Sequence, residues 1–226
     1  MKKYQSHGMG LNSVGLDQIL DNDVERVHVD PGCEHPLTYL YEPYYLQHQE
    51  ITIIHPEVEG YKNIYDYYYQ KVGCAPFRAY RSCTDKWKKR PLESYYKDPA
   101  IIYLGIAYDE RHRVKLYERG GFTYEYPLVD EKITRKGCIE LIEDAGLKLP
   151  PKSGCYFCPF QSKQSWIKLC KDHPEHYQKA IELEELSPNI DLYPKGLRWL
   201  HGRIDENLEQ TTLVDEDWEC QFCMSI

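Results

Sequence analysis

In the first half of the chain, segments with the hydrophobic pattern of strands alternate with segments that have the pattern of helices. Short apolar or alternating runs, typical of strands, are separated by longer segments with helical spacing. The predicted strands cover residues 3–6, 24–30, 51–54, 101–106 and 122–128. The predicted helices cover residues 14–20, 35–48, 64–72 and 84–96. Because strands that alternate with helices favour crossover connections, this half predicts an α/β fold with a mainly parallel sheet and flanking helices.

Beyond residue 130 the pattern becomes helical. Helices are predicted over residues 135–145, 162–169 and 174–186. A proline-containing connector, residues 147–152, separates the first of them from a cysteine-rich turn. We therefore predict an α/β nucleotide-binding core over 1–130, a helical C-terminal part over 131–206 that carries this turn, and an acidic tail over 207–226.

Composition limits where the chain is expected to work. Charged residues make up 28% of the chain, the mean hydropathy is −0.67, and no run of about 18 apolar residues is present. The first residues lack the apolar core of a secretion signal. We expect a cytoplasmic protein with no membrane partner. Its nine cysteines are then ligands, redox thiols or buried hydrophobes rather than stable disulfides.

The net charge of −8 argues against an extended nucleic-acid-binding surface, which needs a basic face. A local basic pocket remains open, because residues 86–90 carry four cations close to Arg78 and Arg81. The alternative for this stretch is a solvated helix face. The 21 tyrosines would suit base stacking, although half-buried helix surface is their more common role.

Two glycines between the first predicted strand and the first helix form a candidate phosphate loop. Gly8 and Gly10 allow backbone amides to approach a phosphate, and Ser13 adds a hydroxyl donor. The loop lacks the Lys-Ser/Thr ending of a Walker A motif, and a plain turn is the alternative. Asp30 and Glu34 follow the second strand, where they would hold a metal ion or a ribose or cap a helix.

Cys155 and Cys158 form a CxxC turn, which suits a metal, a disulfide or a redox pair. A second CxxC, Cys220 and Cys223, lies near the end of the chain. The two pairs together would make a zinc site, but 61 residues separate them, more than in a usual zinc ribbon. Cys220 and Cys223 are instead assigned as a mobile dithiol with a catalytic role, with a tail that has no chemistry as the alternative.

Six motifs occur in the order found in a known family. They are Gly8–Ser13 (similar to SGGxDS), Asp30–Pro36 (DTGxExP), Arg81–Leu92 (RxCT…K..PL), Leu104–Arg113 (GI..DE..R), Tyr126–Leu128 and Ser153–Phe160. The chain resembles the phosphoadenosine phosphosulfate (PAPS) reductase family of the adenine nucleotide alpha-hydrolase-like superfamily, and it is most similar to short, phage-type members. The resemblance covers about residues 4–187.

This resemblance implies a twisted parallel sheet with an adenine nucleotide over the carboxyl end of the first strand. By resemblance, Gly8, Gly10, Asn12 and Ser13 cradle phosphate or sulfate, and Arg81, Lys88 and Arg113 pair with the anionic substrate. Branches of the family hold a [4Fe–4S] cluster with thiolates. Cys83, Cys138, Cys155 and Cys158 are the expected ligands here, with zinc as the alternative metal.

The chain also departs from the family pattern. Asn12 replaces the aspartate of the loop, Met9 replaces a glycine, and the C-terminal ECGLH motif of the reductases is missing. We expect either sulfonucleotide reduction or ATP-dependent sulfur transfer, with Mg²⁺ on the nucleotide and a thiol or electron-donor protein as partner. A nucleic-acid base stays open as the acceptor. The alternatives are a nucleotide-binding regulator without turnover and a zinc-stabilised structural module.

Overall fold

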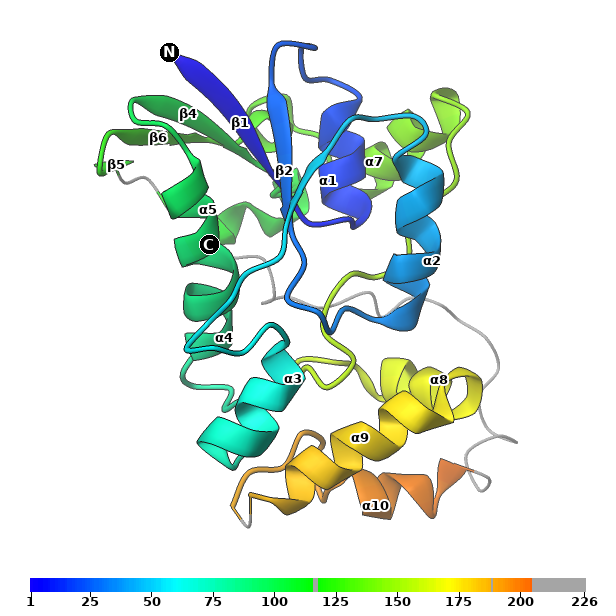
Figure 1. The fold of residues 1–226 in the computed structure, drawn as a ribbon. Helices are drawn as coiled ribbons and strands as arrows, with labels where there is room; N and C mark the ends of the chain where they lie inside the picture. Colours follow the sequence, from blue (N-terminus) through cyan, green and yellow to red (C-terminus); the bar gives the residue numbers. More distant parts are fainter. Residues whose placement is uncertain (116–117, 188, 205–226) are drawn as a thin grey trace.

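Six strands form one sheet, and the computed structural model describes residues 1–115, 118–187 and 189–204 around it. The strand order is β3-β2-β1-β4-β6-β5, and the first five strands in this order are parallel (Figure 1). The parallel strands are β1 (Lys2–His7), β2 (Glu25–Val29), β3 (Thr52–Ile54), β4 (Ala100–Leu104) and β6 (Phe122–Glu125). The short strand β5 (Glu118–Arg119) is antiparallel to β6 at the edge. The predicted α/β class is confirmed.

The predicted fifth strand is shorter than its sequence pattern suggested. Strand β6 ends at Glu125, and α6 (Pro127–Asp130) begins directly after Tyr126. Proline has no amide hydrogen for a sheet ladder, and its fixed φ suits the first turn of a helix. The last residues of the predicted strand therefore turn into a helix.

Helices cover both faces of the sheet. On one face lie α1 (Leu11–Asp17), α2 (Pro36–Tyr45) and α7 (Arg135–Asp144), and α5 (Arg90–Tyr95) covers the other (Figure 1). Helix α7, which the sequence analysis placed in the helical part, packs against α1. This close approach depends on Gly15, because a Cβ there would lie 2.7 Å from the Cβ of Cys138.

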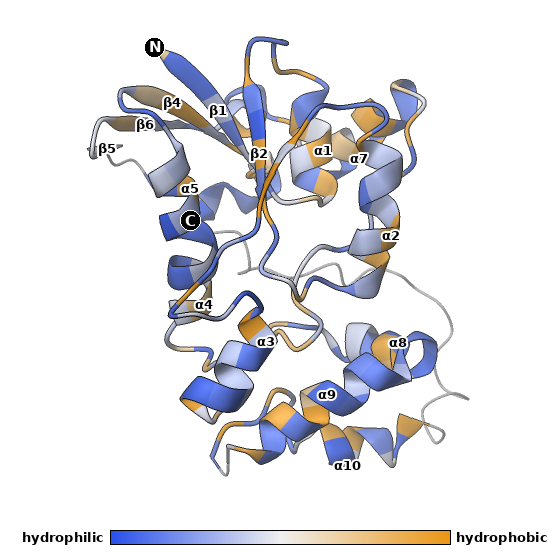
Figure 2. Cartoon of the chain, viewed as in Figure 1, coloured by the Kyte–Doolittle hydropathy of each residue, from blue (hydrophilic) through white to orange (hydrophobic). Residues whose placement is uncertain are grey.

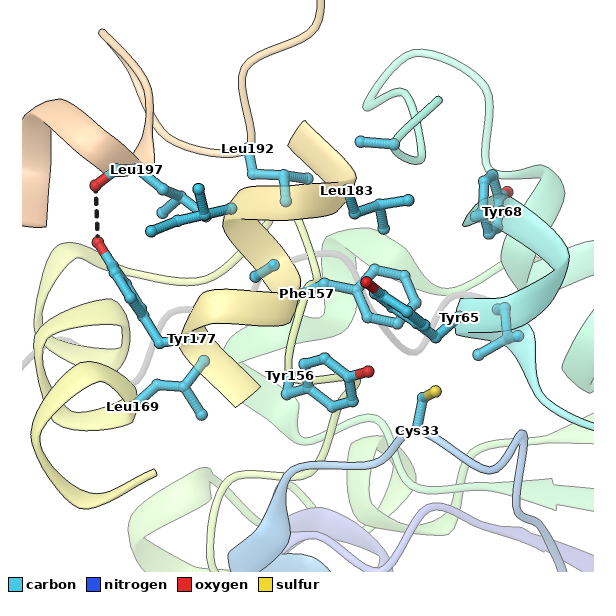
Figure 3. Packing of buried hydrophobic residues seen from close by; sticks show 14 of the residues in the cluster. Cys33, Tyr65, Tyr68, Tyr156, Phe157, Leu169, Tyr177, Leu183, Leu192 and Leu197 are labelled. Atoms are coloured by element: carbon cyan, nitrogen blue, oxygen red, sulfur yellow. Dashed lines mark hydrogen bonds between the residues drawn. The ribbon is translucent and has the colours of Figure 1, made fainter. Parts of the chain in front are cut away.

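Seven further helical segments share a second core below the carboxyl edge of the sheet. They are α3 (Ile64–Asp66), the π-helical segments η1 (Tyr67–Val72) and η2 (Asp85–Lys89), α4 (Ser82–Thr84), α8 (Lys163–Asp172), α9 (Pro174–Glu185) and α10 (Leu197–His201). Trp87, Phe157 and Trp166 are fully buried in this core. Figure 3 shows its packing, with the Tyr177 hydroxyl donating to the carbonyl of Leu197 at 2.8 Å. The helical core therefore combines residues from both halves of the chain.

Hydropathy follows this arrangement. In Figure 2 the apolar colour is concentrated on β4 and on inward-facing parts of the helices, and the outer helix surfaces are mostly polar. No helix in the described ranges is both long enough and apolar enough to cross a membrane. The 3-10 helix η3 (Tyr108–Arg113), which follows β4, lies at the edge of the sheet where the predicted site residues gather.

Candidate functional site

The glycine loop after β1 is packed tightly from two sides. The Gly8 amide donates to Ser13 Oγ at 3.0 Å, so the hydroxyl folds back over the loop. A Cβ on Gly10 would lie 2.6 Å from Ser153 Oγ, and one on Gly105 would lie 3.0 Å from the Asn12 carbonyl oxygen. The two glycines thus let the segment before the CxxC turn and the end of β4 close against the loop.

Met9 adopts a backbone conformation that usually favours glycine. Its φ is +52°, in the left-handed region that costs a residue with a side chain roughly 1–2 kcal/mol. The Met9 side chain is fully buried with Val14, Tyr41 and Tyr45. This burial offsets the backbone strain, so the loop keeps its conformation without the glycine.

A buried polar network supports the loop from below, and the sequence analysis missed it. His7 Nδ1 accepts from the Met9 amide at 3.2 Å, and His7 Nε2 lies 3.1 Å from Asp17 Oδ2. Asp17 also accepts from Arg26 Nε at 3.3 Å and from the Tyr45 hydroxyl. The sequence did carry a signal for this network. Polar residues occupy interior positions of β1 and β2, and buried polar side chains need partners. These contacts tie the loop to α1 and β2.

Arg113 reaches the same edge from η3. Its Nη1 donates to Glu110 Oε1 at 2.7 Å, and Asn12 Nδ2 donates to Glu110 Oε2 at 2.6 Å. Arg135 also lies close, with Nη1 3.4 Å from Asn12 Oδ1 and 3.8 Å from Glu110. The Asn12 amide, predicted to contact phosphate, thus bonds to Glu110. Arg135 was not singled out from the sequence, because it lies 123 positions from Asn12.

The Arg113 guanidinium is only partly satisfied by these contacts. Its side chain is 7% exposed. Its Nε and Nη2 atoms are buried without a hydrogen-bond partner among the described residues. A buried charged group with unpaired donors is costly unless an anion or another acceptor meets it. Arg113 is therefore the predicted anion contact with the clearest unmet hydrogen-bonding capacity, and anion binding by it stays a prediction.

Lys152 is a second buried cation near the loop. It immediately precedes Ser153, whose hydroxyl defines the close approach at Gly10. Its Nζ atom is buried and has no hydrogen-bond partner in the described part of the chain. From the sequence, this lysine was expected only in the connector over residues 147–152, with no role in the site. A lysine after two prolines gave no local signal, and its position depends on how the connector folds over the loop.

Glu34 joins three segments at the carboxyl end of β2. Its side chain is 1% exposed. One oxygen accepts from Lys88 Nζ at 2.6 Å and the other from the Gly154 amide at 2.8 Å. Burial alone would raise the pKa of this carboxyl, but Lys88 and the amide hydrogen bond outweigh it and lower the pKa. Glu34 and Lys88, predicted to contact nucleotide and anion, thus pair with each other.

We expect Glu34→Gln to lower the free energy of unfolding at pH 7 by about 1–3 kcal/mol, because the charged hydrogen bond to Lys88 is lost. The lowered pKa means that this contribution is complete above the ordinary value of 4.5 and disappears as the pH falls through the lowered value. Urea unfolding at pH 7 and near pH 3.5 measures the difference. It should shrink at the lower pH.

A matched control is Glu59→Gln, which removes an exposed pair with Lys86. Its effect should be smaller than that of Glu34→Gln at pH 7 and should stay small at both pH values, because exposed ion pairs contribute little to stability. An equal loss for Glu34→Gln at the two pH values would contradict the ion-pair explanation, since it would point to a packing defect.

Asp30 organises the turn after β2. Its Oδ1 atom accepts from the Gly32 amide and from the Tyr39 hydroxyl, both at 2.8 Å. Its Oδ2 atom lies 3.6 Å from Nδ1 of His55. Burial and then Asp30 itself raise the pKa of Tyr39, which keeps this hydroxyl a donor. The two bonds to Oδ1 show that Asp30 stabilises this turn. Contact of Asp30 with a metal ion or a ribose stays a prediction.

The predicted cysteine ligands fall into separate parts of the structure. Cys83 and Cys155 pack against the helical core together with Cys33. Cys33 and Cys83 are close enough to add to the rise in the pKa of Cys155, which burial and then Glu34 mainly cause. Cys138 lies instead between α1 and α7, with Leu16 and Leu128. Burial raises the pKa of Cys138 to about 12.

The four-thiolate centre stays a prediction, and Cys138 lies in a different core cluster from Cys83 and Cys155. In residues 1–115, 118–187 and 189–204, no group of three or more His, Cys, Asp or Glu side chains is arranged to hold a metal ion. Cys138 is explained by helix packing against Gly15. Cys158 donates its amide to the Cys155 carbonyl at 3.0 Å, as in a tight turn. Cys220 and Cys223 lie outside the described residues.

Arg81 lies apart from the Arg113 group. Its guanidinium carbon is 5.3 Å from the ring centre of Phe160, two residues beyond the CxxC turn. The predicted anion contacts are thus distributed along the edge: Arg113 is near the glycine loop, Lys88 is paired with Glu34, and Arg81 contacts the turn. The common edge follows from the carboxyl ends of the parallel strands, where ligands of open α/β sheets bind.

Comparison with known proteins gives little further information. No protein-family model matches the chain. An uncharacterized protein of the archaeon Methanocaldococcus jannaschii is 22% identical over 187 residues, which cover 74% of this chain and 43% of that protein. The matched region is thus less than half the length of the archaeal relative.

Proposed function

We propose that the chain binds the phosphate or sulfate group of an adenine nucleotide at the carboxyl edge of β1, β2 and β4. In this proposal it acts as a PAPS reductase-like enzyme in sulfur chemistry. The observation that carries the proposal is the buried Arg113 guanidinium with two unpaired donor atoms. The nucleotide is ATP or a sulfonucleotide, and its adenine is inferred from the six-motif resemblance.

Glu110 gives Arg113 a fixed orientation. Glu110 binds the Nη1 atom. The Nε and Nη2 atoms, which form one edge of the guanidinium, are then left to donate to an anion. This edge of a guanidinium matches two oxygens of a phosphate or sulfate. Lys152 adds a second buried positive charge. The Ser13 hydroxyl, which accepts from Gly8, keeps its own hydrogen available as a third donor.

These residues would act on charge that develops during the reaction. In sulfur transfer, the acceptor attacks the α-phosphorus of ATP and pyrophosphate leaves, so cations at the loop stabilise the departing negative charge. In sulfonucleotide reduction, a thiolate attacks sulfur and the adenine nucleotide leaves with its phosphate. Both reactions place a departing phosphate at the glycine loop. No step is assigned to a metal centre, and the four-thiolate cluster stays a prediction.

A nucleotide-binding regulator without turnover is the second candidate, and Asn12 favours it. The position carries an amide instead of the family's aspartate, and this amide is held by Glu110 at 2.6 Å. A neutral, occupied side chain is a weaker ligand for the metal ion that accompanies ATP.

Product analysis separates these candidates. The anaerobically purified protein is incubated with ATP and magnesium, and AMP and pyrophosphate are measured. A parallel reaction supplies sulfonucleotides with a thiol reductant, and sulfite is measured. Formation of either product supports the enzyme. Nucleotide binding without any product supports the regulator, and absence of binding by every nucleotide contradicts both.

A further inference from the structure

An exposed aromatic platform stands next to the candidate site. It consists of the exposed residues Phe77, Arg78 and Tyr80 together with the half-buried Arg81 and Phe160. The Phe77 and Tyr80 side chains are 45% and 73% exposed. Their rings are stacked, with centres 5.8 Å apart and planes 30° apart. Two large aromatic rings that are exposed side by side do not contribute to the core. Exposed apolar groups of this kind are typical of binding surfaces.

The loop that carries these rings is anchored at its base. Ala75 and Pro76 are buried. The Ala75 amide donates to Ser187 Oγ at 2.7 Å, which ties the loop to the end of α9. The rings are therefore held outward by a fixed backbone, rather than exposed through lack of structure. A preformed platform loses less conformational entropy on binding than a mobile loop does.

Positive charge accompanies the rings. The guanidinium carbons of Arg78 and Arg81 lie 5.8 and 5.3 Å from the ring centre of Phe160. Residues 71–97 contain eight lysines and arginines but only two acidic residues, in a chain whose net charge is −8. Several of these cations pair with acids, including Lys86 with Glu59 and Arg90 with Asp85. This stretch is therefore positively charged in an otherwise acidic chain, as is the stretch over residues 145–171 that carries Phe160.

We propose that the aromatic platform binds single-stranded nucleic acid. Unpaired bases stack on Phe77 and Tyr80, and Arg78 contacts the backbone phosphates or stacks on a base. A duplex keeps its base faces covered, so the exposed rings fit a single strand better. One loop of this size binds only a few nucleotides. Such a short site is compatible with the acidic net charge, which argues against an extended nucleic-acid-binding surface.

Phe160 connects the platform to the candidate site. It belongs to the same turn as Gly154, whose amide binds Glu34 at 2.8 Å. A strand bound on the platform would thus lie beside the carboxyl edge of the sheet. Resting on the proposed function, we infer that the acceptor in the sulfur chemistry is a nucleic-acid strand. Strand binding itself needs no nucleotide chemistry and is tested separately.

Fluorescence anisotropy of the full chain with labelled 12-mers of oligo-dT and oligo-U tests the proposal. At about 50 mM salt the wild type should bind both single strands and bind a duplex of equal length more weakly. Tyr80→Ala and Phe77→Ala should each weaken single-strand binding by about 5- to 100-fold. Arg78→Gln should reduce the slope of log affinity against log salt by about 0.7.

Trp199→Ala is the matched control, because Trp199 is also an exposed ring flanked by two cations, Lys195 and Arg203. It should leave strand binding within about twofold of the wild type, since stacking on the platform is intact. Circular dichroism confirms that each variant is folded. No single-strand binding, equal binding of the duplex, or unchanged binding by Tyr80→Ala would overturn the proposal. Equal displacement by polyglutamate would also overturn it, in favour of an acidic protein partner.

ATP binding is measured on the same samples. Loss of strand binding in Tyr80→Ala with ATP binding retained supports two separate surfaces. Strand binding by a wild type that binds no nucleotide would refute the proposed function and leave the platform standing. ATP binding without strand binding would refute only the platform.

Discussion

Asp17→Ala is expected to lower the free energy of unfolding by about 3–5 kcal/mol, the cost of leaving a buried charge without its partner. The Asp17 and Arg26 side chains are 1% and 3% exposed. Removing the carboxylate leaves Arg26 Nε and the Tyr45 hydroxyl without the acceptor that they share, and it takes the negative charge away from His7 Nε2. Arg26 keeps bonds to the carbonyls of Val24 and Asp21, but these do not neutralise its charge.

Urea unfolding followed by circular dichroism measures this effect. Asp23→Ala is the control, because Asp23 forms an exposed pair with Lys3 at 2.9 Å, and its removal should cost less than about 1 kcal/mol. An Asp17→Ala loss no larger than that of Asp23→Ala would show that the network does not hold the loop to α1 and β2.

Arg113→Ala is expected to reduce the affinity for the nucleotide by roughly 100-fold, equivalent to about 3 kcal/mol for a charged hydrogen-bond pair to phosphate or sulfate. Arg113→Lys should recover only part of the affinity, since a lysine cannot bind two oxygens in the plane of a guanidinium. Isothermal titration calorimetry gives the affinity, and a urea curve shows whether each variant is folded.

Arg111→Ala provides the control for Arg113. Arg111 lies in the same 3-10 turn but packs over the Tyr108 ring and bonds to the Tyr108 carbonyl. Its removal should change the affinity by less than about twofold, because in the described structure its side chain forms no ion pair or hydrogen bond with Glu110 or the loop. Equal loss in both variants would indicate a general charge effect rather than a contact at Arg113.

Local patterns predicted most of the sheet. Each of the five parallel strands lies within or beside a predicted run, because side-chain alternation and apolar runs report directly on burial. The exception at residues 126–128 came from Pro127, which starts α6. The interior polar residues of β1 and β2 carried a signal of their own, since buried polar side chains at strand positions require partners.

Contacts between distant residues could not be predicted in this way. Cys138 was grouped with the other cysteines by resemblance, but its side chain fills the space that Gly15 leaves between α1 and α7. Asn12 and Arg113 were both predicted as anion contacts, and only the structure shows that Glu110 holds the amide and leaves part of the guanidinium unpaired. Spacing along the chain carries no information about such pairings, which depend on how the elements pack.

Equilibrium dialysis of the full chain against ATP, AMP, a sulfonucleotide and adenosine tests most directly whether the carboxyl edge of the sheet binds the anionic group of a nucleotide. We predict that ATP or the sulfonucleotide binds at least about tenfold more tightly than adenosine, since only they meet Arg113 and Lys152 with negative charge. This preference should disappear in Arg113→Ala. Equal binding of adenosine and the charged nucleotides, or no binding of any of them, would contradict the account.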